Sequence, residues 1–357
     1  MKIIHCSDLH LDSPLGRHFT PAQAKARNAE LCAAFSRMVQ FARREQVEAV
    51  LIVGDLFDSA YASAQTAGFV LEQIRAAGEI TFFYIRGNHD GSRDPLAGMA
   101  LPGNLKTFGP VWTSYSCGDV LITGMELGPE KPELCFAGLD LPAAQCNIVM
   151  LHGELSAQPG QEQIPTAALR GKHIDYLALG HLHSYQVGKL DDRGIFCYSG
   201  CLEGRGFDEC GEKGFVLLSV QHGSIRHEFV PFASRILHEL PVDITGAETV
   251  SQILTLLHQA AGDIPESDLV KFVLTGTHSL QTQKDTAFLR KMLEPEFFCI
   301  KIKDESCLRI DRESYENDIS LRGEFIRLVM ASDKSEAQKQ QIISCGIRAL
   351  MGEEVAL

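Results

Sequence analysis

Five short apolar segments of this chain each run directly into a cluster of aspartate, histidine, asparagine or glycine. Each segment has only four or five residues, a length that suits a buried β-strand. The segments and their clusters are 2–6 with Asp8 and His10, 49–53 with Gly54 and Asp55, 81–85 with Gly87, Asn88, His89 and Asp90, 148–151 with His152, and 176–179 with Gly180, His181 and His183. Loops at the carboxyl ends of strands converge while the strands hold them rigid. We therefore expect the five clusters to meet at one site.

The elements between these segments indicate an α/β fold. Apolar residues recur at helical spacing in 22–45 and again in 64–77, between the first three segments. A strand, helix, strand, helix, strand order predicts parallel crossover connections. Further strands are expected at 120–125, 134–138, 195–199, 215–220 and 225–230, and a second sheet is their natural place.

The pattern changes at residue 235. Strands are expected at 241–244, 269–274 and 298–303, with helices at 249–261 and 285–293. Thr245 and Glu248 match a T-x-x-E capping box that would open the first of these helices. Two more helices are expected at 319–330 and 334–351. The predicted organisation is thus a domain at 1–234, a small α/β domain at 235–306 and a helical tail at 307–357.

Charge and cysteine usage limit the function classes. The chain has 46 acidic and 33 basic residues and a formal net charge of −13, which argues against a broad basic surface that holds nucleic acid by charge alone. A bound dication could still reverse that field locally. The 11 cysteines form no C-x-x-C pair, as is typical of reduced cytosolic thiols. With no visible signal peptide or bilayer-length apolar stretch, we expect a cytoplasmic protein without membrane association.

The ligand types in the five clusters indicate a pair of metal ions. Each fragment alone is weak, because a lone buried histidine is usually a hydrogen-bonded core residue. Five fragments in this order make coincidence a poor explanation. Carboxylate, imidazole and amide oxygen ligands suit Mn, Fe or Zn, and the thiolates of a structural zinc site are missing. The ligands are too many for one ion, and a bridging carboxylate would divide them between two ions about 3.5–4 Å apart, as in enzymes that displace groups at phosphorus.

The ordered motifs resemble those of the calcineurin-like metallophosphoesterases, and within them the SbcD-type DNA-repair exonuclease subunits with their YhaO-like branch. The motifs are D-x-H at 8–10, G-D-x-x-D at 54–58, G-N-H-D at 87–90, His152 and G-H-x-H at 180–183. The narrower resemblance rests on the stretches 7–14, 54–58 and 204–215. The resemblance implies a four-layer α-β-β-α sandwich of two mixed sheets, followed by a small α/β cap domain and a C-terminal helical segment.

The resemblance also implies a role for each motif residue. One metal ion would be held by Asp8, His10, Asp55 and His183, and the other by Asp55, Asn88, His152 and His181. Asp55 would be the bridge. His89 would meet the phosphate and protonate the leaving oxygen, and Asp90 would orient the imidazole of His89.

Other charged residues have weaker motif context. Contact with substrate phosphate is a hypothesis for Arg86, Arg205 and Lys213, although a basic residue near a loop is more often a solvated surface charge. Asp12 and Asp58 are expected to be loop groups that form hydrogen bonds. The histidines without motif context, among them His5, His18 and His173, are expected to be structural.

The surroundings of the metal motifs favour DNA as the substrate. Phosphoprotein phosphatases usually continue G-D-x-x-D with Arg-Gly, whereas Ser59 and Ala60 follow Asp58 here. Small phosphodiesterases are typically shorter and need no added domain, so the segment 235–303 favours a macromolecular substrate. The hypothesis is a DNA exonuclease, with endonuclease action also open. A small-molecule phosphodiesterase or phosphatase is the alternative, and an inactive scaffold comes third.

The resemblance implies cofactors and partners as well. It implies two divalent metal ions, foremost Mn²⁺ with Fe, Zn or Mg as alternatives, and it implies DNA, an SMC-like ATPase of the SbcC/YhaN type and a homodimer. The chain has no G-x-x-x-x-G-K-[ST] loop, so ATP dependence would come from that partner. The apolar residues of the two last helices could pack on their own domain or dock the partner, and both interpretations stay open.

Overall fold

The computed structural model describes residues 1–17, 19–58, 60–90, 95–127, 136–157, 160, 162–279, 282–309 and 318–350. The chain divides into two compact units, Met1–Leu237 and His238–Leu357. His18 and Ser59 lie outside the described residues. Among the described residues, no helix combines the length and the apolarity needed to cross a membrane.

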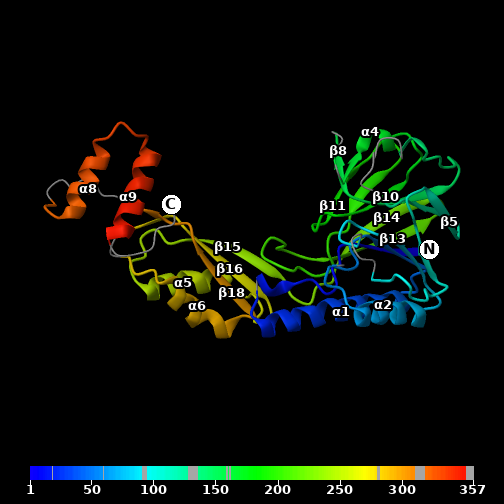
Figure 1. Cartoon of the computed structure of the whole chain (residues 1–357), viewed down its shortest axis with the longest axis horizontal. Helices are drawn as coiled ribbons and strands as arrows, with labels where there is room; N and C mark the ends of the chain where they lie inside the picture. Colours follow the sequence, from blue (N-terminus) through cyan, green and yellow to red (C-terminus); the bar gives the residue numbers. More distant parts are fainter. Residues whose placement is uncertain are drawn as a thin grey trace. The chain divides into compact units, whose positions relative to one another are not determined.

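The first unit contains two six-stranded mixed sheets, which confirms the predicted fold class (Figure 1). The first sheet has the order β14-β13-β1-β2-β3-β4. Its strands are β1 (Lys2–Cys6), β2 (Ala49–Val53), β3 (Thr81–Ile85), β4 (Leu105–Thr107), β13 (Gly214–Gln221) and β14 (Ser224–Pro231). β1 to β4 run parallel, while β13 is antiparallel to both β1 and β14. The predicted parallel crossovers are therefore present.

Two long helices connect the parallel strands of the first sheet. They are α1 (Pro21–Arg44) and α2 (Ala64–Ala76), and Figure 1 shows them along one side of the unit. α1 begins at Thr20, whose side chain accepts the backbone N–H of Gln23, and it buries an apolar stripe that includes Phe35 and Met38. α2 begins in the same way, because Ser63 accepts the N–H of Thr66.

The second sheet has the order β11-β12-β10-β7-β6-β5. Its strands are β5 (Thr113–Cys117), β6 (Val120–Gly124), β7 (Cys146–His152), β10 (Tyr176–Gly180), β11 (Gln186–Lys189) and β12 (Ile195–Tyr198). The central four, β6, β7, β10 and β12, run parallel. Two of the five ligand-bearing segments thus belong to this sheet and three to the first.

The expected placement of two strands in the second sheet was wrong. The segments 215–220 and 225–230 form β13 and β14, which extend the first sheet beside β1. Apolar alternation shows that a strand is half-buried but carries no information on which neighbour it pairs with. The predicted strand at 134–138 is also incorrect in its described part, because Phe136 and Ala137 are helical. The apolar Phe136 is buried by packing, not by pairing.

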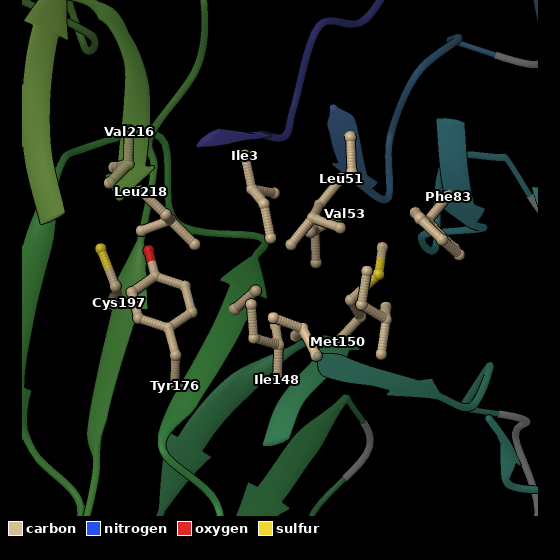
Figure 2. Packing of buried hydrophobic residues seen from close by; sticks show 14 of the residues in the cluster. Ile3, Leu51, Val53, Phe83, Ile148, Met150, Tyr176, Cys197, Val216 and Leu218 are labelled. Atoms are coloured by element: carbon tan, nitrogen blue, oxygen red, sulfur yellow. The ribbon is translucent and has the colours of Figure 1, made fainter. Parts of the chain in front are cut away.

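The main core of the first unit lies between the two sheets, as Figure 2 shows. The facing side chains include Ile3, Leu51, Val53 and Phe83 of the first sheet and Ile148, Met150 and Tyr176 of the second. A second cluster covers the other face of the second sheet and includes Leu151, Leu179, Ile164 and Leu169. The fourth layer of the sandwich is therefore built from the short helix α4 (Thr166–Leu169) and loops. Short elements complete the unit: η1 (Leu15–Arg17), β8 (Glu154–Ser156) and β9 (Gln163–Pro165).

The second unit contains a three-stranded sheet of order β15-β16-β18. The strands are β15 (Leu237–Asp243), β16 (Leu269–Thr275) and β18 (Cys299–Asp304), and the helices are α5 (Val250–Ala261) and α6 (Thr286–Leu293). Leu257, Phe272 and Leu289 lie in their common core. The short elements are η2 (Glu294–Glu296) and the parallel pair β17 (Thr277–His278) and β19 (Cys307–Leu308).

The capping box of α5 lies four residues later than predicted. Thr249 is the N-cap, and its side chain accepts the N–H of Gln252. The predicted cap, Thr245, instead accepts the backbone N–H of Thr277. Both tetrapeptides fit the S/T-x-x-E/Q pattern, so the motif alone could not decide between them.

The chain of the second unit ends in a helical hairpin of α8 (Leu321–Met330) and α9 (Glu336–Leu350). Ile326, Ile343 and Ile347 pack against Leu308 in a small core. Other apolar side chains of the same segment stay exposed, among them Leu321 and Leu328. The apolar residues of this segment are thus divided between internal packing and the surface.

Candidate metal centre

The loops after the ligand-bearing strands hold unusual backbone conformations. The φ angle is 54° at Asp8, 44° at His10, 50° at Asp55 and 99° at His181. Residues other than glycine rarely adopt positive φ, and such conformations cluster at functional sites. Two backbone hydrogen bonds join the first two loops: the N–H of Asp8 donates to Gly54 (3.1 Å) and that of His10 to Asp55 (2.9 Å). The ends of β1 and β2 are therefore held together as one ligand platform.

Five of the predicted ligand side chains point at one another across the carboxyl edges of the two sheets. The Nε2 atoms of His10 and His183 lie 3.3 Å apart. Oδ2 of Asp55 is 3.6 Å from Nε2 of His10 and 3.5 Å from Nε2 of His152, so it lies between these two rings. Oδ1 of Asp8 is 3.8 Å from Nε2 of His183.

These donors form two groups that could each hold a metal ion. One group is Asp8, His10 and His183, and the other is Asp8, Asp55 and His152, with all donor atoms of a group within 4.8 Å of one another. Carboxylate oxygens and imidazole nitrogens that face one another at these distances fit divalent transition metals. Asp8 belongs to both groups, which suits an arrangement of two ions with a shared carboxylate.

Asn88 and His181 lie beside the second group. Oδ1 of Asn88 is 3.0 Å from Nε2 of His152, and the ring of His181 packs edge-on against that of His152 with centroids 5.5 Å apart. The backbone N–H of His181 donates to both carboxylate oxygens of Asp8, at 3.0 and 3.1 Å. The structure thus brings all seven predicted ligand residues together.

Two histidines are held so that Nε2 faces the metal groups. Nδ1 of His152 donates to the carbonyl oxygen of Val53 (2.9 Å), and Nδ1 of His183 donates to Oε1 of Glu209 (2.7 Å). Since a carbonyl or carboxylate oxygen only accepts, Nδ1 carries a proton in each ring, and Nε2 is the nitrogen that is left for a metal ion. This is the arrangement that metal-binding histidines usually have.

Sequence reasoning missed Glu209 as a functional residue. Its side chain is 5% exposed, and besides His183 it binds Arg205 through the backbone N–H (2.7 Å) and the guanidinium (2.8 Å). Glu209 lies in the stretch 204–215 that carries the family resemblance, but no spacing rule links it to a histidine 26 residues earlier. Only the fold shows that the two meet.

The electrostatics of the site reflect crowded negative charge. Burial raises the pKa of Asp8. Burial opposes ionisation of Asp55 as well, but the hydrogen bond and charge of His152 outweigh it and hold the pKa of Asp55 below its usual range. Burial would lower the pKa of His152, yet the hydrogen bond and charge of Asp55 raise it to about 9. Two buried carboxylates thus draw positive charge to this place, which a bound dication would supply.

His89 lies at the open side of the cluster. Its side chain is 48% exposed, and its ring packs edge-on against that of His10 with centroids 4.9 Å apart. The backbone N–H of His89 donates to Oδ1 of Asp55 (2.9 Å), which fixes the loop to the ligand platform. His89 is therefore placed beside the ligand set, in contact with solvent.

The predicted role of Asp90 is contradicted by the structure. The buried carboxylate of Asp90 accepts the backbone N–H groups of Leu56 (3.2 Å), Phe57 (2.9 Å) and Gly87 (3.0 Å). Three buried donors need this acceptor, so Asp90 joins two loops and does not orient the imidazole of His89. Burial, together with the charge of Asp55, raises the pKa of Asp90 to about 7. Among the described residues, the carboxylate nearest to Nδ1 of His89 is that of Asp58, at 3.8 Å.

Two motif glycines are required by the close packing of His152. Gly54 has φ +80°, and a Cβ there would lie 2.1 Å from Nδ1 of His152. A Cβ at Gly180 would lie 2.0 Å from the carbonyl oxygen of Val53, the acceptor of the His152 proton. Any side chain at either position would displace the imidazole or its acceptor.

The three basic residues considered for phosphate contact have different surroundings. Arg86 pairs with Glu126, with 2.6 Å between Nη2 and Oε2. Arg205 pairs with Glu209. Lys213 is 3% exposed and donates to the carbonyl oxygen of His183 (2.8 Å), a position suited to supporting that loop. Phosphate contact by any of the three stays a prediction.

Comparison with known proteins agrees with this geometry. Residues 1–185 match the calcineurin-like phosphoesterase family. The metallophosphoesterase YhaO of Bacillus subtilis is 29% identical over 323 residues, which cover 83% of this chain and 78% of YhaO. The DNA double-strand break repair protein Mre11 of Methanosarcina mazei is 23% identical over 85% of this chain and 50% of its own length, so the chain spans about half of that relative.

A third relative is the SbcD component of the SbcCD nuclease of Staphylococcus epidermidis. It is 23% identical over 282 residues, which cover 68% of this chain and 72% of that relative. With more than half of the sequence matched by one family and the ligand set of its motifs assembled at the strand ends, the chain belongs to the calcineurin-like phosphoesterases and is similar to their SbcD- and YhaO-like members.

Proposed function

We propose that the chain is a nuclease, a metal-dependent phosphodiester hydrolase that acts on DNA as an exonuclease, with endonuclease action also open. The observation that carries the proposal is the inward-facing set of carboxylates and imidazoles around Asp55. The choice of DNA is supported by two relatives, of which one is named as the DNA double-strand break repair protein Mre11 and the other as a component of the SbcCD nuclease.

The proposed cofactors are two divalent ions, foremost Mn²⁺, with Fe, Zn or Mg as alternatives. Asp8, His10, Asp55 and His183 would hold one ion, and Asp55, Asn88, His152 and His181 the other. When bound, such ions lower the pKa of a water nucleophile and stabilise charge on the phosphoryl oxygens. The donor set fits them, because it offers hard carboxylate oxygens, an amide oxygen and oriented imidazoles without a thiolate.

His89 is the proposed general acid. A leaving alkoxide needs a proton, and an exposed imidazole at the open side of the ligand set can deliver one. The half-exposed ring of His89 meets this requirement, while its backbone N–H is anchored on Asp55. Asp58, whose Oδ1 is 3.8 Å from Nδ1 of His89, is placed to orient the imidazolium once it is protonated.

The proposed domains are a catalytic domain at 1–234, a cap at 235–306 and a helical tail at 307–357. The proposed assembly is cytoplasmic and contains two copies of the chain with an SMC-like ATPase of the SbcC/YhaN type.

An apolar depression on the α8–α9 hairpin supports docking of that partner. Leu321, Phe325, Gly346, Ala349 and Leu350 line it. Leu321 is 73% exposed, so apolar surface is available for a partner helix.

Digestion of end-labelled single- and double-stranded DNA with Mn²⁺ tests the proposal. The comparison substrates are a small phosphodiester and a phosphomonoester. Shortening of the DNA ladder that is absent in an Asp8→Asn variant is the expected result. Hydrolysis of the monoester alone would contradict a nuclease, and hydrolysis of the small diester alone would indicate a small-molecule phosphodiesterase.

Metal content separates the enzyme from an inactive scaffold. An active centre of this kind should retain about two transition ions per chain after dialysis. DNA binding of the isolated chain over a salt series adds a second measurement. Because the net charge is −13, we expect weak binding without metal, and tight metal-free binding with a steep salt dependence would contradict this.

A further inference from the structure

Two buried serines form a hydroxyl pair that joins the two sheets beside Asp8. Ser7 directly follows β1 of the first sheet, and Ser199 directly follows β12 of the second. Both residues are 0% exposed, and their Oγ atoms lie 2.8 Å apart. An isolated parallel bridge between Ser7 and Cys201 fixes the two backbone segments next to each other. The hydroxyl pair is therefore held in place by the backbone on both sides.

The two hydroxyls are directed at the carboxylate of Asp8. Oγ of Ser7 lies 2.5 Å from Oδ2 of Asp8. A carboxylate that binds a metal ion is ionised and only accepts, so the hydroxyl of Ser7 donates to it. Because the Ser7 proton is then engaged, the short contact between the serines requires that Ser199 donates to Oγ of Ser7. The carbonyl oxygen of Gly200 is the more distant acceptor, at 3.4 Å from Ser7 and 3.2 Å from Ser199.

Hydrogen bonds occupy the two oxygens of Asp8 unequally. An ionised carboxylate offers about four lone-pair positions, two on each oxygen. Oδ2 accepts the hydroxyl of Ser7 and the backbone N–H of His181 (3.1 Å). Oδ1 accepts the same N–H (3.0 Å) and lies 3.8 Å from Nε2 of His183. By these contacts both positions of Oδ2 are filled, whereas Oδ1 keeps one position for a metal ion.

This difference bears on which carboxylate the two ions share. By position alone Asp8 could be shared, because it belongs to the group with His10 and His183 and also to the group with Asp55 and His152. One remaining lone-pair position suffices for one ion only. Oδ2 of Asp55, in contrast, faces Nε2 of both His10 and His152 at 3.6 and 3.5 Å. Asp55 is therefore the carboxylate that suits both ions.

We propose that Ser7, supported by Ser199, is a positioning residue that restricts Asp8 to one metal ion. The inference rests on the metal centre of the proposed function and extends it to the side chains that set its coordination. Without the hydroxyl of Ser7, one position of Oδ2 is left unfilled inside a buried site, since Asp8 is 1% exposed. Asp8 is then free to bind through both oxygens or to turn towards the second ion, and its orientation is no longer fixed.

Metal binding of the full chain tests this role without requiring turnover. Titration with Mn²⁺, followed by electron paramagnetic resonance, measures the affinity for each ion. We expect Ser7→Ala to bind one of the two ions about tenfold more weakly and to leave the other nearly unchanged. Infrared difference spectra before and after addition of Mn²⁺ report whether a carboxylate binds through one oxygen or two. We expect Ser7→Ala to shift the carboxylate bands relative to wild type.

Two further variants distinguish positioning from general stability. Ser199→Ala leaves the contact between Ser7 and Asp8 in place and should give a smaller change in the same direction. Thr123→Val is the matched control, because Thr123 is 1% exposed and its hydroxyl is also paired at 2.8 Å, with Ser114 of a neighbouring strand. This control should keep the wild-type metal affinities and bands. Urea unfolding of the metal-free variants checks that each is folded, and Ser199→Ala alone decides if Ser7→Ala does not fold.

Two results would overturn the inference. One is wild-type metal affinity with wild-type bands in both serine variants, and the other is an equal loss of affinity in Thr123→Val.

DNA digestion separates this inference from the nuclease proposal. If the wild-type chain digests DNA and the serine variants bind Mn²⁺ as it does, only the role of Ser7 is wrong. If Ser7→Ala selectively loses one ion while the wild-type chain leaves DNA intact, the nuclease proposal is wrong and the role of Ser7 stands.

Discussion

Two buried histidines of the first unit, His5 and His152, have opposite ionisation behaviour. His5 is the second-last residue of β1, where its Nδ1 accepts the hydrogen of the Tyr176 hydroxyl (2.9 Å) and its Nε2 donates to the carbonyl oxygen of Leu179 (3.1 Å). Burial lowers the pKa of His5 to about 3. His152, at the end of β7, is raised to a pKa of about 9, because Asp55 outweighs its burial.

Facing charge, and not the degree of burial, accounts for the difference between His5 and His152. The hydrogen-bond partners of His5 are neutral, so the neutral ring is stable there. The carboxyl edge gathers Asp8 and Asp55 around His152. In this region the positive charge of a protonated histidine balances buried carboxylates. A bound dication can supply that positive charge in place of the proton.

Removal of the central carboxylate should have the largest effect. Asp55→Ala deletes the oxygen between His10 and His152, so both ions should be lost and turnover should fall by roughly 1000-fold or more. The pKa of His152 should fall as well, because burial is then opposed only by the charge of Asp8 and the hydrogen bond to Val53, and histidine NMR signals would show this. Asp192→Ala, at a fully exposed carboxylate, is the control, and two retained ions in Asp55→Ala would contradict the bridging role.

Replacement of His89 should separate metal binding from chemistry. His89→Gln is expected to keep both ions and to lose turnover by roughly 100-fold or more, since the ring is exposed beside the ligand set and donates a proton to the leaving group. Metal analysis and single-turnover kinetics measure the two properties independently. Wild-type turnover in this variant would remove His89 from the mechanism.

Glu209→Gln should weaken one half of the metal centre. The amide can no longer fix the Nδ1 proton of His183 as a carboxylate does, so metal affinity on that side should fall by about 10- to 100-fold. Metal titration followed by Mn²⁺ electron paramagnetic resonance would distinguish a weakly bound ion from a tightly bound one. Glu203→Gln is a matched control, because Glu203 is also buried against arginines but contacts no ligand histidine. Equal loss in both variants would indicate general destabilisation.

The sequence predicted which residues meet at the candidate metal centre because these residues are local to strand ends. Asp8, Asp55 and His152 each follow an apolar run, and parallel strands bring such ends together. The side chains that support the ligand residues were harder to predict from the sequence. Glu209 is far from His183 in sequence and contacts it only because the chain folds. Asp90 follows His89 directly in sequence, but its carboxylate accepts three backbone N–H groups instead of contacting the imidazole. Sequence adjacency could not show where a carboxylate points.

The fold, like the candidate site, could be predicted only in part. Element positions followed from apolar periodicity, and β1, β2 and β3 are parallel as expected. The pairing of β13 with β1 was not predicted, because alternation fixes the buried face of a strand but not its neighbour. The cap of α5 at Thr249 was missed because two consecutive stretches, 245–248 and 249–252, fit one motif.

The contrast between His5 and His152 also predicts a dependence of stability on pH. The folded state keeps His5 neutral down to a pH of about 3, whereas the unfolded chain takes up this proton below its ordinary pKa of 6.5. The stabilisation by neutral His5 is therefore complete above pH 6.5 and is lost as the pH falls towards 3, by about tenfold in the folding equilibrium per pH unit. Urea unfolding between pH 7.5 and 4.5 gives the free energy of unfolding as a function of pH, and this free energy should depend less on pH in His5→Gln than in wild type. An identical pH dependence would contradict the buried neutral ring.

The smallest effect on turnover is expected at the α8–α9 hairpin, which has no charged cluster like that around His152 among its described residues. Leu321 and Leu328 are 73% and 65% exposed, so Leu321→Ser and Leu328→Ser remove little buried area and should change stability by less than about 0.5 kcal/mol. Turnover on a small phosphodiester should stay within about twofold of wild type, because the catalytic groups lie in the other unit. The same changes should weaken capture of an SMC-like ATPase, since they replace apolar contact area with hydroxyls. Full binding of that partner by the double variant would show that the exposed leucines of the hairpin are not its docking surface.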